Sequence, residues 1–167
     1  EGFDYTGTAL AGQNGGTGWG ANVWSDPDGD TPLSNDGVSL ANPVPLTYTP
    51  VGSRVAFFAS GEAERRLGTT MPLTGEAATF FFSALVKRQG AFRFEFLDNS
   101  NNIRWRFGAN DAGDGAVGVS GDVFTAGLFP LDETVFVVCK ILTRASVSDQ
   151  VFMNVYRAGD IVPAAEP

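Results

Sequence analysis

The feature that most constrains the fold is a strict alternation of apolar and charged residues in two neighbouring segments, AFRFEFL and NIRWRFG. Successive side chains of a β-strand point to opposite faces of a sheet, so this alternation is typical of half-buried strands. The linker DNSNN consists of turn-forming residues. The sequence therefore predicts a β-hairpin with one apolar face turned to a core. The residues expected on that face are Phe92, Phe94, Phe96, Ile103, Trp105 and Phe107.

The same period of two recurs in the rest of the chain, and no segment keeps a helical period for more than a turn or two. The runs TFFFSALV and TVFVVCKIL are almost continuously apolar, which is typical of central strands covered on both faces. Further strands are expected at Arg54–Ser60, Glu62–Leu67, Thr79–Lys87, Gly115–Ser120, Thr134–Thr143 and Gln150–Tyr156. The sequence thus predicts an all-β protein in which about ten or more strands form a two-sheet sandwich.

The length and charge of the chain limit its organisation and its partners. Its 167 residues suit a single domain over 1–167 with a sizeable core. The net charge of -8 disfavours nucleic acids and anionic membranes as partners, because both need a basic surface. No stretch is long and apolar enough to span a bilayer, so no membrane insertion is expected. The one cysteine, Cys139, lies in an apolar run and is expected to be a buried hydrophobic residue.

The sequence lacks the residues on which common hydrolytic mechanisms depend. There is no histidine, which excludes Ser-His-Asp chemistry. The nearest pair of carboxylates is Glu62 and Glu64, which would lie roughly 6.5–7 Å apart on one strand face. Arg65 and Arg66 follow directly, and no third acid is placed to assist glycoside hydrolysis. We expect these residues to be solvent-facing charges and the protein not to be an enzyme.

The run SDPDGDTPLSNDG is the strongest candidate for a metal site, because it places oxygen ligands at alternate positions as a calcium loop does. It departs from the usual loop at Thr31, where glycine is invariant, and at Gly37, where a bidentate glutamate is normal. Two interpretations stay open, a polar turn and a calcium site. The candidate ligands are Asp26, Asp28, Asp30, Asn35 and Asp36. A second acidic turn, NDAGDG at residues 110–115, carries the same alternatives with a weaker pattern.

The opening stretch GQNGGTGWGANVW combines closely spaced glycines with Trp19 and Trp24. It is not a phosphate-binding loop, because the required lysine and the following Ser or Thr are missing. Glycines allow backbone to lie close against a sheet, and buried indoles would fix such a segment in place. Stacking of a sugar on an exposed tryptophan is the alternative, which makes Trp19 and Trp24 candidate ligand-binding residues.

Six segments, in this order, carry a resemblance to a known family: FDY…LAGQNGGTGWGANVWS, DPDGD, LTYTPVGSRVAFFASGEAERRLGTT, TFFFSALVKR, TVFVVCKI and SDQVFMNVY. The chain resembles the concanavalin A-like, or laminin-G-like, jelly-roll domains of proteins secreted by environmental bacteria such as planctomycetes and verrucomicrobia. The resemblance implies two curved antiparallel sheets and an extracellular or cell-surface location. It does not imply one activity, because this fold hosts lectins, glycanases and structural domains.

The resemblance also implies a closing strand, often similar to DEIRIG, after the segment that ends near Tyr156. The printed chain has only residues 157–167 there, and we expect them to be a tail or an exchange segment. Because the chain begins at Glu1 rather than at methionine, a mature or trimmed product is expected. An unfilled sheet edge can accept a strand from a neighbouring subunit. The candidate donor segments are EGFDYTG at the start of the sequence and the tail.

Two functions follow as expectations. The first is a structural, non-enzymatic β-sandwich that self-associates into a homopolymer at a surface or in a filament. The alternative is a lectin-like module that binds a glycan, with calcium as its cofactor. A glucanase-type enzyme is the least expected, because its paired acidic motif is absent.

Overall fold

The structure is a computed structural model that describes residues 9–14, 21–26, 40, 43–44, 63, 65–66, 78–98, 100–118, 122–144 and 147–163. The chain divides into two compact units. The first comprises Glu1–Leu40 and Thr47–Met71, and the second comprises Ala41–Leu46 and Pro72–Pro167. Every strand described below belongs to the second unit.

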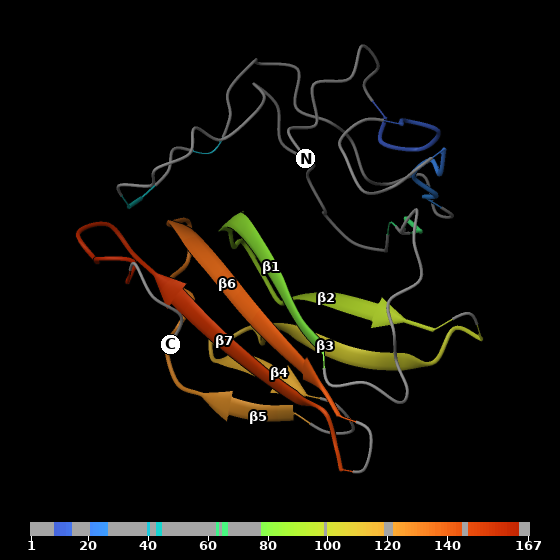
Figure 1. The fold of residues 1–167 in the computed structure, drawn as a ribbon. Coiled ribbons are helices and arrows are strands. Elements are labelled where there is room, and N and C mark those ends of the chain that lie inside the picture. Colours follow the sequence, from blue (N-terminus) through green and yellow to red (C-terminus); the bar gives the residue numbers. More distant parts are fainter. Residues whose placement is uncertain are drawn as a thin grey trace. The chain divides into compact units, whose positions relative to one another are not determined.

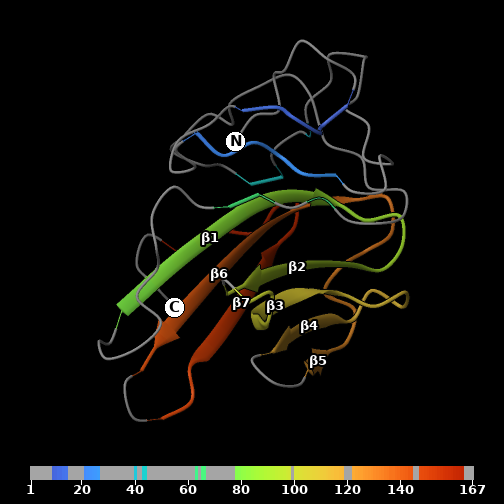
Figure 2. The same cartoon turned by 90° about the vertical axis from the view of Figure 1, so that its right-hand side faces the viewer.

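The second unit contains two antiparallel sheets (Figure 1). One sheet has the strand order β1-β6-β7 and the other has the order β2-β3-β4-β5. Figure 2 shows the sheets as two layers. The strands are β1 (Ala78–Lys87), β2 (Phe92–Leu97), β3 (Ile103–Ala109), β4 (Gly115–Gly118), β5 (Asp122–Thr125), β6 (Thr134–Thr143) and β7 (Gln150–Tyr156). The predicted all-β class is confirmed, whereas the jelly-roll connection of the strands stays a prediction.

The expected aromatic hairpin is present as β2 and β3. Phe94 pairs with Phe107, and Phe96 pairs with Trp105. The register then shifts between Phe96 and Leu97, which breaks the alternation at the end of the hairpin. As a result Ile103, which we expected on the core side, is 40% exposed. The expectation for Ile103 was wrong because the alternation cannot reveal a bulge.

The two apolar runs differ in their surroundings. β6 lies between β1 and β7 and is the central strand that was predicted, with Val137 fully buried. β1 lies at one end of the described sheet, and alternate side chains along its first half are exposed. Phe81 of β1, for example, is 52% exposed. The prediction that β1 is covered on both faces is therefore wrong over this part of the strand.

The core lies between the two sheets and is largely aromatic. The ring of Phe82 in β1 lies 5.3 Å from that of Phe94 and 5.1 Å from that of Phe107, measured between centroids. Such tilted and edge-on contacts stabilise beyond the area that they bury. Cys139 of β6 belongs to the same cluster and is fully buried. This burial confirms the expected role as a small hydrophobic residue, and it also raises the pKa of the thiol.

Candidate functional site

The segment around Trp24, in the first unit, is held by backbone hydrogen bonds. The amide of Gly12 donates to the carbonyl of Trp24 at 2.8 Å, and the amide of Trp24 donates to the carbonyl of Gln13 at 3.0 Å. The Trp24 side chain is half-buried. The two stretches at residues 12–13 and 24 are thus joined side by side. The predicted placement of the glycine-rich segment against a sheet stays a prediction.

Arg65 fastens this segment from a distant part of the sequence. Its Nε donates to the carbonyl of Asn22 at 3.0 Å, and its Nη2 donates to Oδ1 of Asn14 at 2.9 Å. The guanidinium carbon also lies 5.9 Å from the centroid of the Trp24 ring, a cation–π distance. One face of the indole therefore lies against a cation. A sugar that stacked on Trp24 would have to use the other face or displace Arg65.

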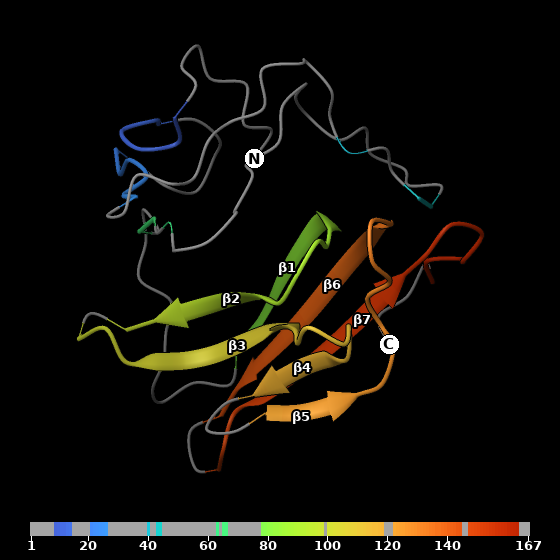
Figure 3. The ribbon, with the colours of Figure 1, turned by 180° about the vertical axis from the view of Figure 1, so that it is seen from behind.

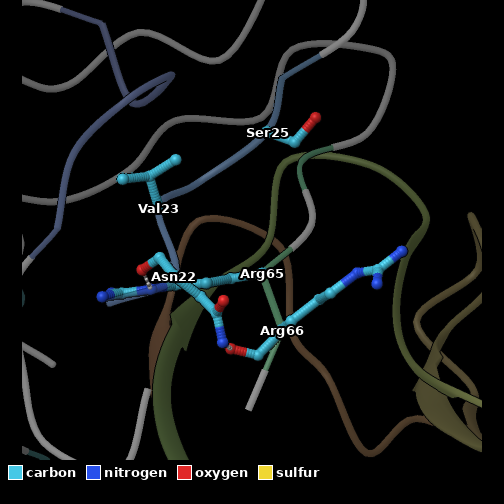
Figure 4. Close-up of a pocket in the computed structure, with 5 residues that line it drawn as sticks. All are labelled: Asn22, Val23, Ser25, Arg65 and Arg66. Atoms are coloured by element: carbon cyan, nitrogen blue, oxygen red, sulfur yellow. Dashed lines mark hydrogen bonds between the residues drawn. The ribbon is translucent and has the colours of Figure 1, made fainter. Parts of the chain in front are cut away.

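A small pocket adjoins this arginine (Figure 4). Its volume is about 190 Å³. Its lining residues are Asn22, Val23, Ser25, Arg65 and Arg66. Nδ2 of Asn22 donates to the carbonyl of Arg66 at 3.1 Å, while the Arg66 guanidinium extends away from Asn22. Among the described residues, this lining offers hydrogen-bond donors and no carboxylate, a composition that suits an anion or hydroxyl groups better than a metal cation.

The predicted calcium loop lies almost entirely outside the described residues. Asp26 alone is described, and it is half-buried. Asp28, Asp30, Asn35 and Asp36 lie outside, as do Trp19 and the pair Glu62 and Glu64. Within the described ranges, no three or more His, Cys, Asp or Glu residues group so that they could hold a metal ion. The calcium site therefore stays a prediction.

The second acidic turn, at residues 110–114, uses its carboxylates within the protein. Oδ2 of Asp114 accepts a bond from Nδ2 of Asn110 at 3.0 Å, and Oδ1 accepts one from the amide of Gly127 at 3.1 Å. These bonds, led by the one from Asn110, lower the pKa of Asp114. Oδ1 of Asp111 accepts from the amide of Ala91 at 3.0 Å. The arrangement favours a polar turn over a calcium site.

Arg88 is an organising residue that the sequence pattern did not reveal. It follows β1 and is only 7% exposed. Its Nε donates to the carbonyl of Phe129 and its Nη1 to the carbonyl of Asp111, both at 3.0 Å. A buried guanidinium needs such acceptors. Arg88 thereby ties the connection between β1 and β2 to two later loops, and this role depends on contacts that local periodicity does not encode.

The edge of β7 is the most unusual surface of the second unit. In the part of the chain that the structure describes, β7 has one neighbour, β6. Its seven residues, QVFMNVY, include no charged residue and no proline. Phe152, on the outer face of this strand, is 46% exposed. Exposed edges in soluble proteins are normally protected by charges, prolines or bulges, so this edge has the composition of a strand that pairs on both sides.

No protein family, no curated protein and no solved structure gives a match to this chain. In the described ranges, no helix has the length and apolar composition needed to cross a bilayer. The candidate sites are thus the pocket beside Arg65 and the edge of β7.

Proposed function

We propose that this protein is a non-enzymatic, extracellular structural β-sandwich that assembles into a homopolymer by exchange of a strand or terminus between subunits. The observation that carries the proposal is the uncharged edge of β7. The absence of histidine from the sequence supports the non-enzymatic part. The resemblance to secreted bacterial jelly-roll domains supports the extracellular part.

The backbone groups of an edge strand can drive such an assembly. A free edge presents a row of N–H and C=O groups that an extended segment can pair with. The outer face of β7 adds apolar area, since Phe152 is nearly half exposed. When donor and acceptor lie on different surfaces, the contact is head-to-tail and repeats into a filament unless it closes into a ring.

Glycan binding, with calcium as cofactor, is the alternative function. The pocket beside Arg65 favours it, because its lining includes the Arg66 guanidinium and the Ser25 hydroxyl, which are groups that can donate to hydroxyl or carboxylate groups of a sugar. Arg65 already bonds to Asn14 and Asn22, so it would bind a ligand only with what remains of its donor capacity.

Light scattering over a range of concentrations, together with electron microscopy, tests the proposal. We expect the mass per particle to rise with concentration. The variant Phe152→Lys places a charge at the β7 edge and should lower that mass. Phe81→Lys is the matched control, because Phe81 lies on the same sheet and is similarly exposed but belongs to β1. A wild-type protein that is monomeric at every concentration would overturn the proposal, and binding on a glycan array would then favour the alternative.

A further inference from the structure

On the side of β1, the edges of the two sheets of the second unit lie opposite each other. On the side of β7, the four-stranded sheet extends beyond the three-stranded sheet. On the β1 side, Phe82 contacts rings of both β2 and β3. On the other side β4 lies opposite β7, since a Cβ added to Gly115 would come within 2.9 Å of the Met153 methyl group. β5 is the next strand beyond β4 and the last of its sheet (Figure 3). No described strand therefore lies opposite β5.

Val123 of β5 shows that this side of the core is uncovered. The strand pairings place Phe107, Val117 and Val123 in one row across the sheet, on the same face. Phe107 is 1% exposed, whereas Val123 is 69% exposed. A valine on the core face is normally buried, and each square ångström left in water forgoes about 25 cal/mol. The exposure of Val123 marks a strand position beside β7 that the described residues leave open.

The geometry of the sheets sets the size of this position. Neighbouring strands lie about 4.8 Å apart and packed sheets about 10 Å apart, so one strand added beside β7 would lie over β5. The β7 edge of a second folded subunit would not fit. Its own β4, which lies opposite its β7, would have to occupy the place that β5 already takes. The open position therefore accepts a single extended segment, such as a chain terminus.

We propose that this position is filled by residues 1–7, EGFDYTG, of a second copy of the chain. The inference rests on the proposed self-association and identifies its acceptor and donor. In this segment, which lies outside the described residues, Phe3 and Tyr5 alternate with smaller or polar residues. A strand with that period turns both aromatic side chains to one face, where they would cover Val123, and leaves Asp4 on the other.

The segment that follows β7 is a poorer donor. After β7 the chain makes a tight turn, in which the amide of Asp160 donates to the carbonyl of Arg157 at 3.1 Å. Pro163 follows three residues later and cannot donate to a ladder. The Arg157 guanidinium also donates to the carbonyl of Gly127, in the loop after β5. These contacts hold residues 157–160 near their own subunit, so the opening segment is the better donor of the two.

The test uses the full chain and a labelled synthetic peptide of residues 1–7. In Val123→Asp a carboxylate replaces the side chain that the donor covers, and its burial without a partner is unfavourable. We expect this variant to reduce both the mass of the assemblies and the affinity for the peptide by about tenfold or more. Phe124→Asp is the matched control, because Phe124 is the next residue of β5 but faces away from the core. It should behave as wild type.

A donor variant keeps the test valid if Val123→Asp fails to fold. The double variant Phe3→Asp and Tyr5→Asp should abolish assembly while its β5 and β7 stay unchanged. Assemblies that persist in both the acceptor and the donor variants would overturn this inference and leave self-association itself intact. A wild-type protein that neither assembles nor binds the peptide would overturn both. A monomer that binds the peptide through Val123 would keep the strand position and overturn the proposed function.

Discussion

The two sides of the β-sandwich are built from the same kind of alternating strand, yet they differ in what covers them. On the β1 side, Phe94 and Phe107 stack with centroids 5.0 Å apart beneath the strands of the opposite sheet. On the β7 side, Val123 occupies an equivalent face and is mostly exposed. Alternation therefore determines which face of the sheet a side chain points to, whereas the order of strands in the opposite sheet decides whether that face is buried.

The largest effect is expected on the β1 side, where strands of the opposite sheet cover the core face. Phe107→Ala should lower the free energy of unfolding by about 3–5 kcal/mol, through lost burial and a cavity beside Phe82 and Phe94. Denaturation by urea measures this change. Arg93→Ala, on the exposed face of the neighbouring β2, should change it far less. Equal losses in the two variants would mean that the register of the hairpin is wrong.

Arg88 is expected to stabilise the same unit through hydrogen bonds rather than through apolar packing. The variant Arg88→Met would leave the buried carbonyl of Phe129 and the partly buried carbonyl of Asp111 without these donors. A loss of about 1–3 kcal/mol in the free energy of unfolding is expected. Gln89→Met is the control, since Gln89 is the exposed neighbour. If Arg88→Met unfolds at the same denaturant concentration as wild type, these hydrogen bonds contribute nothing to the free energy of unfolding.

The turn of the aromatic hairpin should make stability depend on pH. The amide and side chain of Asn102, the amide of Ser100 and the charge of Arg104 lower the pKa of Asp98 from 3.8 to about 2. A lowered folded-state pKa stabilises the protein above the unfolded value, and this contribution disappears as pH falls through the folded value. Thermal melts between pH 5 and about 2 should therefore show a decline that is shallower in Asp98→Asn.

Glu95→Gln is the matched control for that variant, because it removes one exposed carboxylate from the same hairpin. The turn also forms an ion pair, in which Nη2 of Arg104 lies 3.0 Å from Oδ2 of Asp98. Identical pH profiles for wild type and Asp98→Asn would contradict the role of this carboxylate.

The smallest effect is expected on the β7 side, where Val123 of β5 is mostly exposed. Val123→Ala should change the free energy of unfolding of the dilute protein by no more than about 0.5 kcal/mol, because the side chain is already largely hydrated. Thermal unfolding at low concentration measures this value. A loss approaching that of Phe107→Ala would show that something in the same subunit covers Val123, and the contrast between the two sides would then be lost.

Local sequence pattern predicted several strands well. The bounds expected for Thr134–Thr143 and Gln150–Tyr156 are those observed for β6 and β7. Apolar density and β-branched residues dominate these segments, so the local signal and the tertiary environment agree. The hairpin of β2 and β3 was also predicted, because its turn chemistry and alternation coincide. In the register of the hairpin, Glu95 lies opposite Arg106, whereas Arg104 bonds to Asp98.

Other features depend on contacts between distant residues, which local pattern does not contain. β5 was missed because its four residues are too short to show a period. The burial of Arg88 depends on acceptors in distant loops, and the offset of the two sheets depends on the order of their strands. Neither feature can be read from a single segment of the sequence. Of the candidate site residues, the structure describes Trp24, Asp26 and the acidic turn at residues 110–115. It adds Arg65, whose contact with the Trp24 ring spans some forty positions of sequence.

The single thiol of the chain gives this molecule a chemical reporter of its own opening. Cys139 is fully buried in β6, so a thiol reagent can reach it only when the core opens, and burial also raises the pKa of the thiol. The modification rate therefore reports the population of the open state, or the rate of opening when the reagent reacts faster than the core closes, without any added label. A cysteine placed on the surface for attaching a probe would, for the same reason, react selectively in an otherwise unaltered chain.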